Sequence, residues 1–153
     1  LWNLLLAQPS VKPAGLGCRD TLRLEMGYPL YGHELDTKHS PVAAGLDKFV
    51  DFSKDFIGKN ALLAEREKGP KERLVYFKAD SRRSPRNGFK IFTNGAQTGT
   101  VTSGSFSPSL SCGIGTGYVA KGCAIGDKAE VGAEKPEIAV NFVKKPFYSK
   151  TKV

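Results

Sequence analysis

Arg19 is a candidate for holding a ligand. It stands in the run GLGCRDTLRLEMGYPLYGHE, residues 15–34. A guanidinium presents a planar fork of donors and does not lose its charge, so it suits the carboxylates or ring acceptors of an anionic ligand. The residues alone leave an alternative open, in which Arg19 pairs with Asp20 or caps a neighbouring carbonyl and touches no ligand.

Two histidines raise the question of a metal site. His33 and His39 are six residues apart, with Glu34 and Asp36 close to them. This spacing matches neither of the helical pairs, i, i+3 or i, i+4, that bring two imidazoles to one metal ion. We therefore interpret the segment as an ordinary loop and expect no metal site.

The glycine-rich run GIGTG, residues 113–117, superficially resembles a dinucleotide-binding loop. The third glycine of that motif and the helix that must follow it are both missing, so we interpret these glycines as residues that let a strand bend. There is no GxSxG elbow and no Walker-type loop. We expect no catalytic residue in this chain.

Three segments are predicted to be helical. Residues 2–7 place apolar side chains at i, i+3 and i+4, and residues 58–68 contain good helix formers followed by Gly69-Pro70. Residues 16–26 fit a strand or a helix, and Asp20 near the start with Gly27 as a stop favours a short helix. The irregular stretch 28–52 is predicted to be a long ordered connection.

The second half of the chain reads as strands. Short apolar or β-branched runs alternate with Gly, Pro and polar turns, and Asn94-Gly95 is a strong signal for a tight hairpin turn. No helical segment separates the runs, so they predict a closed antiparallel barrel or sandwich. The expected strands are residues 74–77, 89–92, 98–102, 114–119, 128–131 and 138–143.

Composition limits the function classes. The formal charge of +8 favours an anionic partner without choosing among nucleic acid, an acidic protein and a polycarboxylate. The basic stretch 78–90 reads as a solvated loop, and no nucleic-acid-binding module is visible, so we expect no nucleic acid. Three cysteines without CxxC spacing, and an N-terminal apolar run too short for a membrane span, favour reduced thiols in a cytoplasmic protein without a membrane anchor.

Four blocks in one order carry a family resemblance. They are residues 15–34, then DFIGKNAL at 55–62, TSGSFSPSL at 102–110 and KPFY at 145–148. Together they resemble the C-terminal part of the glycine cleavage T-protein (aminomethyltransferase) family, whose members are more than twice as long. Cys18 departs from the pattern, because the family usually has alanine before the arginine.

The resemblance implies a fold and a site. Residues 1–55 would be a short α-containing remnant of the folate-binding domain, and residues 56–153 the C-terminal barrel, mainly β and of the antiparallel Greek-key or jelly-roll type. Arg19 falls on the family's folate-contacting arginine. Tyr28 could lay its ring beside the folate, with core or hinge packing as the alternative. The family's C-terminal tail returns toward the folate, which suggests a positive tail here, with Lys150 and Lys152; a frayed terminus is the simpler account.

The resemblance also implies a reaction. The parent enzyme would transfer the one-carbon unit of an aminomethyl group, carried by lipoylated H-protein, to tetrahydrofolate, giving 5,10-methylenetetrahydrofolate and ammonia. The family's aspartate and glutamate would lie upstream of Leu1, so we expect the chain alone to be inactive. In a eukaryote the location would be the mitochondrial matrix. The alternatives are a related folate-dependent demethylase and a non-catalytic basic β-barrel that acts as an interaction module.

Overall fold

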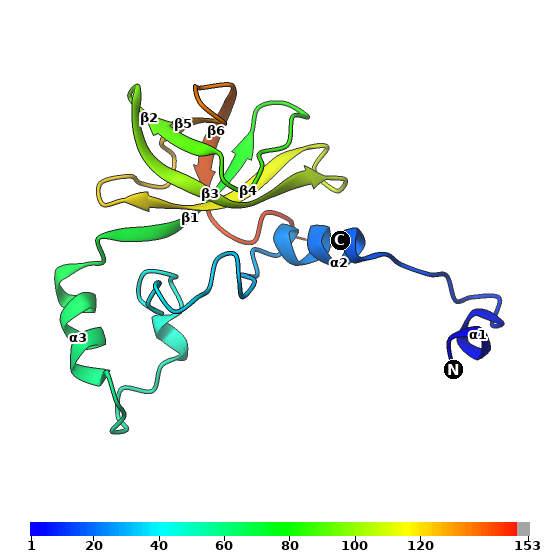
Figure 1. The fold of residues 1–153 in the computed structure, drawn as a ribbon, viewed down its shortest axis with the longest axis horizontal. Helices are drawn as coiled ribbons and strands as arrows, with labels where there is room; N and C mark the ends of the chain where they lie inside the picture. Colours follow the sequence, from blue (N-terminus) through cyan, green and yellow to red (C-terminus); the bar gives the residue numbers. More distant parts are fainter. Residues whose placement is uncertain (150–153) are drawn as a thin grey trace.

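The structure is a computed structural model and describes residues 1–149. A β-barrel forms the body, and the N-terminal half runs along its outside (Figure 1). The helices are α1 (Trp2–Leu6), α2 (Leu16–Glu25), the 3-10 turn η1 (Asp47–Phe49) and α3 (Lys59–Lys68). The strands are β1 (Glu72–Ala79), β2 (Lys90–Thr93), β3 (Ala96–Ser107), β4 (Cys112–Ala120), β5 (Lys128–Gly132) and β6 (Ile138–Val143).

The barrel closes in the order β1-β4-β3-β2-β5-β6, and β6 pairs with β1 again. Every pairing is antiparallel. The predicted fold class, mainly β with a closed antiparallel barrel, is confirmed, and each predicted strand is present. The hairpin turn is also confirmed, because Asn94 and Gly95 have φ values of 52° and 78°, both positive as this turn requires.

One strand is much longer than predicted. β3 continues past Thr102 to Ser107, where its polar residues pair with β4 from Ser103↔Thr116 to Ser107↔Cys112. A bulge between Val101 and Ser103 precedes this extension. Serine and glycine have little β-propensity of their own, so the extension comes from pairing with β4 and not from a local pattern.

The barrel interior explains the glycine run of residues 113–117, which lies in β4. A Cβ atom on Gly115 would lie 2.5 Å from the Phe77 ring, and one on Gly117 would lie 2.6 Å from Ile91 Cδ1. Phe77 and Ile91 are fully buried in the barrel core. The glycines therefore make room for large side chains in a narrow interior.

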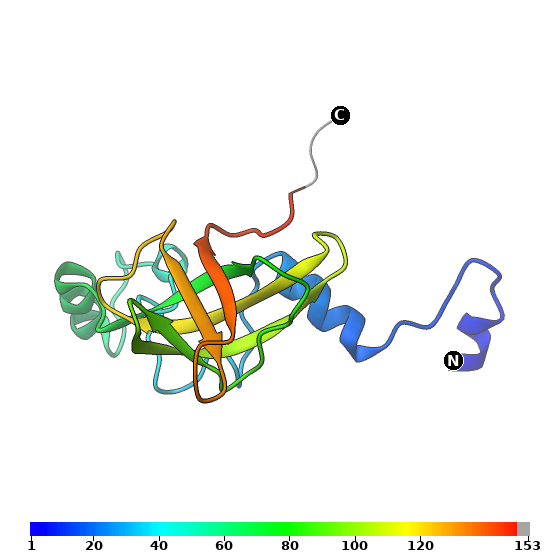
Figure 2. The same cartoon turned by 90° about the horizontal axis from the view of Figure 1, so that it is seen from above.

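The helices differ in how they meet the barrel. α2 packs against β3 and β4, whereas α1 lies apart from the barrel at the end of an extended segment (Figure 2). Trp2 and Leu5 on α1 are 62% and 48% exposed. All three predicted helices are present. Among residues 1–149, no helix is long and apolar enough to cross a membrane.

Candidate functional site

Helix α2 carries the predicted ligand-binding residue and lies on the outer face of the barrel. Its anchor is Leu24, which is fully buried in a second cluster with Tyr76, Ile114 and Phe147. The ring centroids of Tyr76 and Phe147 are 5.9 Å apart in an edge-to-face arrangement. Leu22 on the same helix is 58% exposed. One side of α2 is thus held by the barrel and the other side is open.

Arg23 ties α2 to two other parts of the chain. Its Nη1 donates to Glu34 Oε2 at 2.9 Å, its Nη2 to Ser103 Oγ at 2.8 Å, and its Nε to Asp20 Oδ1 at 2.8 Å. Only 11% of the Arg23 side chain is exposed. The guanidinium therefore links the helix, the connection that follows it and strand β3.

Glu34 is the buried partner in this network. Its side chain is fully buried, and its oxygens accept from Arg23, from the Leu30 N–H at 2.9 Å and from Thr116 Oγ1 at 2.8 Å. Burial opposes ionisation, but hydrogen bonds from Ser103, the Leu30 amide and neighbouring threonines outweigh it, so the pKa of Glu34 is lowered from its usual 4.5. Glu34 is a carboxylate at neutral pH, compensated as a buried charge must be.

Glu25, two residues after Arg23 at the end of α2, makes a second attachment. Only 4% of this residue is exposed, and its carboxylate accepts from Ser107 Oγ at 2.5 Å and from Ser109 Oγ at 2.8 Å. Its backbone carbonyl accepts from the amides of Phe147 at 2.9 Å and Tyr148 at 3.1 Å. The end of α2 is therefore fixed to the β3–β4 turn and to the segment after β6.

The two predicted substrate-binding residues lie at opposite ends of this fixed unit. Arg19 is exposed and, among residues 1–149, makes no side-chain hydrogen bond or ion pair. The alternative pairing with Asp20 is not found, because Asp20 binds Arg23 instead. Tyr28 is 61% exposed, and its backbone N–H and carbonyl bond to Arg23. Both side chains are free at the surface, and neither lines the cavities described below.

The histidines of the connection lie at one cavity of about 310 Å³, together with Tyr118 and Thr102. His39 stacks on Tyr118 with ring centroids 3.9 Å apart, and its Nδ1 is 2.8 Å from Asp36 Oδ1. Its Nε2 lies 3.3 Å from Glu72 on β1. His39 thus fastens the connection to the barrel. Among residues 1–149, no group of three or more His, Cys, Asp or Glu side chains is arranged so that it could hold a metal ion.

The basic stretch 78–90 forms the end of β1 and a loop before β2. Arg83 donates to the Glu137 carbonyl at 2.9 Å and contacts its carboxylate at 3.2 Å. The Arg82 guanidinium lies 4.9 Å from the centre of the Phe106 ring. Arg82 and Arg83 therefore hold the loop against the barrel. Lys150 and Lys152, named for a positive tail, lie outside the described residues.

Sequence reasoning missed the anchoring residues Arg23, Glu25 and Glu34, although all three stand in the run that carries Arg19. Their partners on β3, on β4 and in the turn between these strands are 80 to 84 residues away. The signal available in the sequence was chemical: two acids on or beside a helix that must pack need hydrogen-bond donors. It did not say which serines or threonines supply them.

Comparisons with known proteins agree with this architecture. The family model for the glycine cleavage T-protein C-terminal barrel domain matches residues 72–149, and the model for the GCVT N-terminal domain matches residues 1–54. An aminomethyltransferase of Halothermothrix orenii is 47% identical over an alignment of 152 positions, which covers 96% of this chain and 43% of that protein. A probable aminomethyltransferase of Thermococcus kodakarensis is 44% identical, covering 99% of this chain and 42% of the relative.

A solved structure gives the same result in three dimensions. The glycine cleavage system aminomethyltransferase T from Bartonella henselae superposes with a TM-score of 0.87 and 32% identity, over 96% of this chain and 42% of the other. The chain thus spans well under half the length of these relatives. Because the barrel-domain match takes in residues 72–149, and the barrel itself is present in the structure, the chain belongs to the glycine cleavage T-protein family.

Proposed function

We propose that this chain is the C-terminal part of an aminomethyltransferase that transfers the one-carbon unit of an aminomethyl group on lipoylated H-protein to tetrahydrofolate. The products would be 5,10-methylenetetrahydrofolate and ammonia. The proposal is supported by the family membership and by the names of relatives in bacteria and archaea. We assign residues 1–55 to the remnant of the folate-binding domain and residues 56–153 to the barrel domain, in line with the two family matches.

Arg19 is the residue we propose to hold the folate. The observation that carries this role is the contrast between the two arginines of α2. Arg23 has every nitrogen engaged, whereas Arg19, one helical turn earlier, is exposed with its donors uncommitted. A helix that is fixed by Leu24, Arg23 and Glu25 presents the Arg19 guanidinium from a rigid support, which lowers the entropic cost of binding.

Tyr28 is proposed as a second contact. Its backbone is held by the Arg23 carbonyl and guanidinium, with the N–H donating at 2.9 Å and the carbonyl accepting at 3.3 Å. Its ring is left exposed at the surface. An aromatic face of this kind can stack on a planar pterin or benzoyl ring. Its contribution would be to orient the folate and to exclude water.

The chain contributes positioning and enclosure and no acid or base of its own. Exchange of a reactive one-carbon unit between sulfur and nitrogen depends on orientation and on keeping water out, which a rigid barrel wall can provide. We therefore propose that the isolated chain is inactive and that H-protein and tetrahydrofolate meet in the complete enzyme.

The test is the Arg19→Ala variant of the complete enzyme. We expect tetrahydrofolate affinity, measured by calorimetry, to fall by about 1.5–3 kcal/mol, the range for a hydrogen bond to a charged group. Arg19→Lys keeps the positive charge but loses the paired donors of the guanidinium, so its tetrahydrofolate affinity should lie between those of the wild type and Arg19→Ala. Arg86→Ala, on an exposed loop of the barrel, is the matched control and should bind like the wild type. Unchanged affinity in a folded Arg19→Ala enzyme would refute the role.

A further inference from the structure

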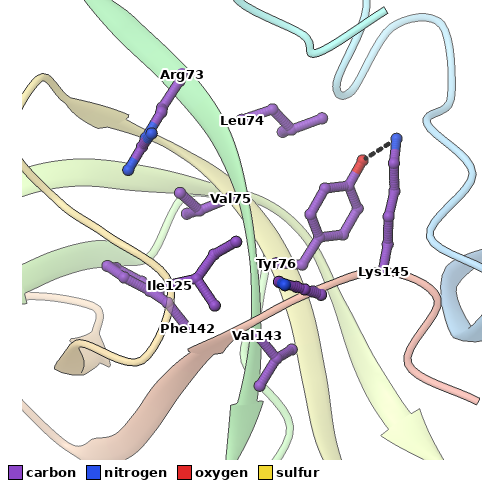
Figure 3. Close-up of a pocket in the computed structure, with 9 residues that line it drawn as sticks. Arg73, Leu74, Val75, Tyr76, Ile125, Phe142, Val143 and Lys145 are labelled. Carbon is purple, nitrogen blue, oxygen red and sulfur yellow. Dashed lines mark hydrogen bonds between the residues drawn. The ribbon is translucent and has the colours of Figure 1, made fainter.

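A cavity of about 330 Å³ opens beside β1 and β6, and Arg19 is not among the residues that line it (Figure 3). Its lining comes from three places: β1, the end of β6 with the two residues that follow it, and the β4–β5 loop. The lining residues are Arg73, Leu74, Val75, Tyr76, Ile125, Phe142, Val143, Lys144 and Lys145. None of them is assigned a ligand contact in the function proposed above.

The cavity exists because β1 and β6 pair over only part of the length of β1. β1 pairs with β4 along residues 72–78, but it pairs with β6 only from Tyr76↔Val143 to Ala79↔Val140. The first half of β1, including Arg73 and Val75, therefore has no β6 residue beside it. Figure 3 shows Val75 and Phe142 on one side of β1, with Leu74 and Tyr76 on the other. The gap gives access from solvent to the barrel core.

The β4–β5 loop forms an apolar wall over this gap. The Gly126 N–H donates to the Phe142 carbonyl at 2.9 Å, and the Phe142 N–H donates to the Asp127 carbonyl at 3.0 Å. These bonds hold Ile125 at the opening, where it is 61% exposed. Val75 and Phe142, behind it, are 8% and 2% exposed. An exposed isoleucine at the mouth of an apolar recess favours an apolar ligand body.

The rim of the cavity is cationic. Arg73, Lys144 and Lys145 are all exposed, the lining contains no carboxylate, and no ion pair joins any of the three to another residue of the range 1–149. Lys145 Nζ donates to Tyr76 Oη at 3.1 Å. Burial and then the nearby Lys48 lower the pKa of Lys145. A cleft with one sign of charge and apolar walls concentrates its field on an incoming anion.

We propose that this cavity is a binding site for a small amphipathic organic anion, with its apolar body against Ile125, Val75 and Phe142 and its carboxylate between Arg73 and Lys144. At about 30 Å³ for a water-sized group, the volume holds on the order of ten non-hydrogen atoms. Octanoate has that size and both halves of the chemistry. The site is separate from Arg19 and does not depend on the folate role.

The first experiment titrates the chain, labelled at isoleucine and valine methyl groups, with octanoate, octan-1-ol and octylamine. A ligand of about ten heavy atoms at about 0.3 kcal/mol per atom gives a dissociation constant on the order of 1–10 mM, which methyl NMR measures well. We expect octanoate to shift the Ile125 and Val75 methyl resonances, and these shifts should reach a plateau as the octanoate concentration rises. Octanol should bind about fivefold or more weakly, because it lacks the charge, and octylamine should not saturate.

Variants locate the site. Arg73→Gln and Lys144→Gln should each weaken octanoate binding about two- to fivefold, the effect of one partly exposed charge pair, and leave octanol binding unchanged. Ile125→Asn should weaken both ligands. Arg86→Gln removes an exposed arginine outside the cavity and should change nothing. All four positions are solvent-exposed, so the variants are expected to fold.

The outcomes separate clearly. Saturable octanoate shifts at Ile125 and Val75 that weaken in Arg73→Gln and not in Arg86→Gln support the proposal. Equal affinity for octanol and octanoate would overturn its anionic part. Octanoate shifts spread over other methyl groups, with Ile125 and Val75 unmoved, would overturn the site itself.

Discussion

The Arg23→Ala substitution tests the claim that a buried ion pair fixes the Arg19 helix. It removes the only guanidinium that compensates Glu34, whose side chain is fully buried, among residues 1–149. It also removes the bonds to Ser103 and Asp20. Breaking a buried pair by deleting one partner costs about 3–5 kcal/mol, because an uncompensated charge stays behind. Glu34 keeps donors from Leu30 and Thr116, which places the expected loss near the lower end, about 3 kcal/mol.

The partly exposed Asp20 pair adds little to that sum, because surface ion pairs are worth about 0–1 kcal/mol. Urea unfolding of the chain, followed by circular dichroism, gives the free energy of unfolding. For a chain of this size, about 3 kcal/mol should also lower the melting temperature by about 6–12 °C. Arg19→Ala is the matched control on the same helix, and it should stay within about 0.5 kcal/mol of the wild type because Arg19 is exposed.

A double variant isolates the charge. Arg23→Met retains the apolar stem, and Arg23→Met with Glu34→Gln removes both charges at once. The double variant should be more stable than Arg23→Met, because the buried carboxylate is gone. If Arg23→Ala unfolded at the same urea concentration as Arg19→Ala, the buried pair would not anchor α2, and the rigid support inferred for Arg19 would be refuted.

Three further predictions follow from the same contacts. Because the pKa of Glu34 is lowered, the stability that its carboxylate contributes is present above the usual pKa of 4.5 and is lost as pH falls through the folded-state pKa. Urea unfolding at pH 6 and at pH 3 should show that the free energy of unfolding falls less in Glu34→Gln than in the wild type. An equal fall in both proteins would contradict this. Gly115→Ala places a Cβ 2.5 Å from the Phe77 ring and should lower the free energy of unfolding by about 1–3 kcal/mol. Gly15→Ala, which has open space around it, is the control and should not lower it. Equal stability of the two variants in urea unfolding would contradict the packing of Gly115 against Phe77. Glu25→Gln weakens the hydrogen bonds to Ser107 and Ser109 and should lower the free energy of unfolding by about 1–3 kcal/mol. The backbone amide of Ser109 should also exchange its hydrogen faster. An unchanged exchange rate at Ser109 would contradict this attachment.

The barrel could be predicted because its strands carry their own local patterns. Apolar and β-branched runs such as residues 74–77 and 138–143 are bounded by turns, and Asn94-Gly95 selects one turn type. The helical reading of residues 16–26 needed Gly27, whose φ of 66° ends α2. The second half of β3 was missed because residues 103–107 become a strand only by pairing with β4.

The candidate site was less accessible from sequence. Arg19 was identified by its place in a family-like block, and the structure adds that its side chain is uncommitted. The anchors Arg23 and Glu34 were not identified, because their donors and acceptors come from strands far along the chain. The cavity beside Ile125 could not be predicted either, since it results from the end of the β1–β6 pairing at Tyr76 and not from any residue pattern.

The distance in sequence between α2 and its anchors has a consequence for folding. Glu25 and Glu34 each accept a hydrogen bond from a residue 82 positions further along the chain. These bonds close very large loops, so we expect them to form only after β3 and β4 have paired. Helix α2, which carries Arg19, therefore reaches its final position on the barrel late, after the second half of the chain has been synthesised. If the β3–β4 hairpin formed slowly or incorrectly, helix α2 would stay unattached to the barrel in newly made protein.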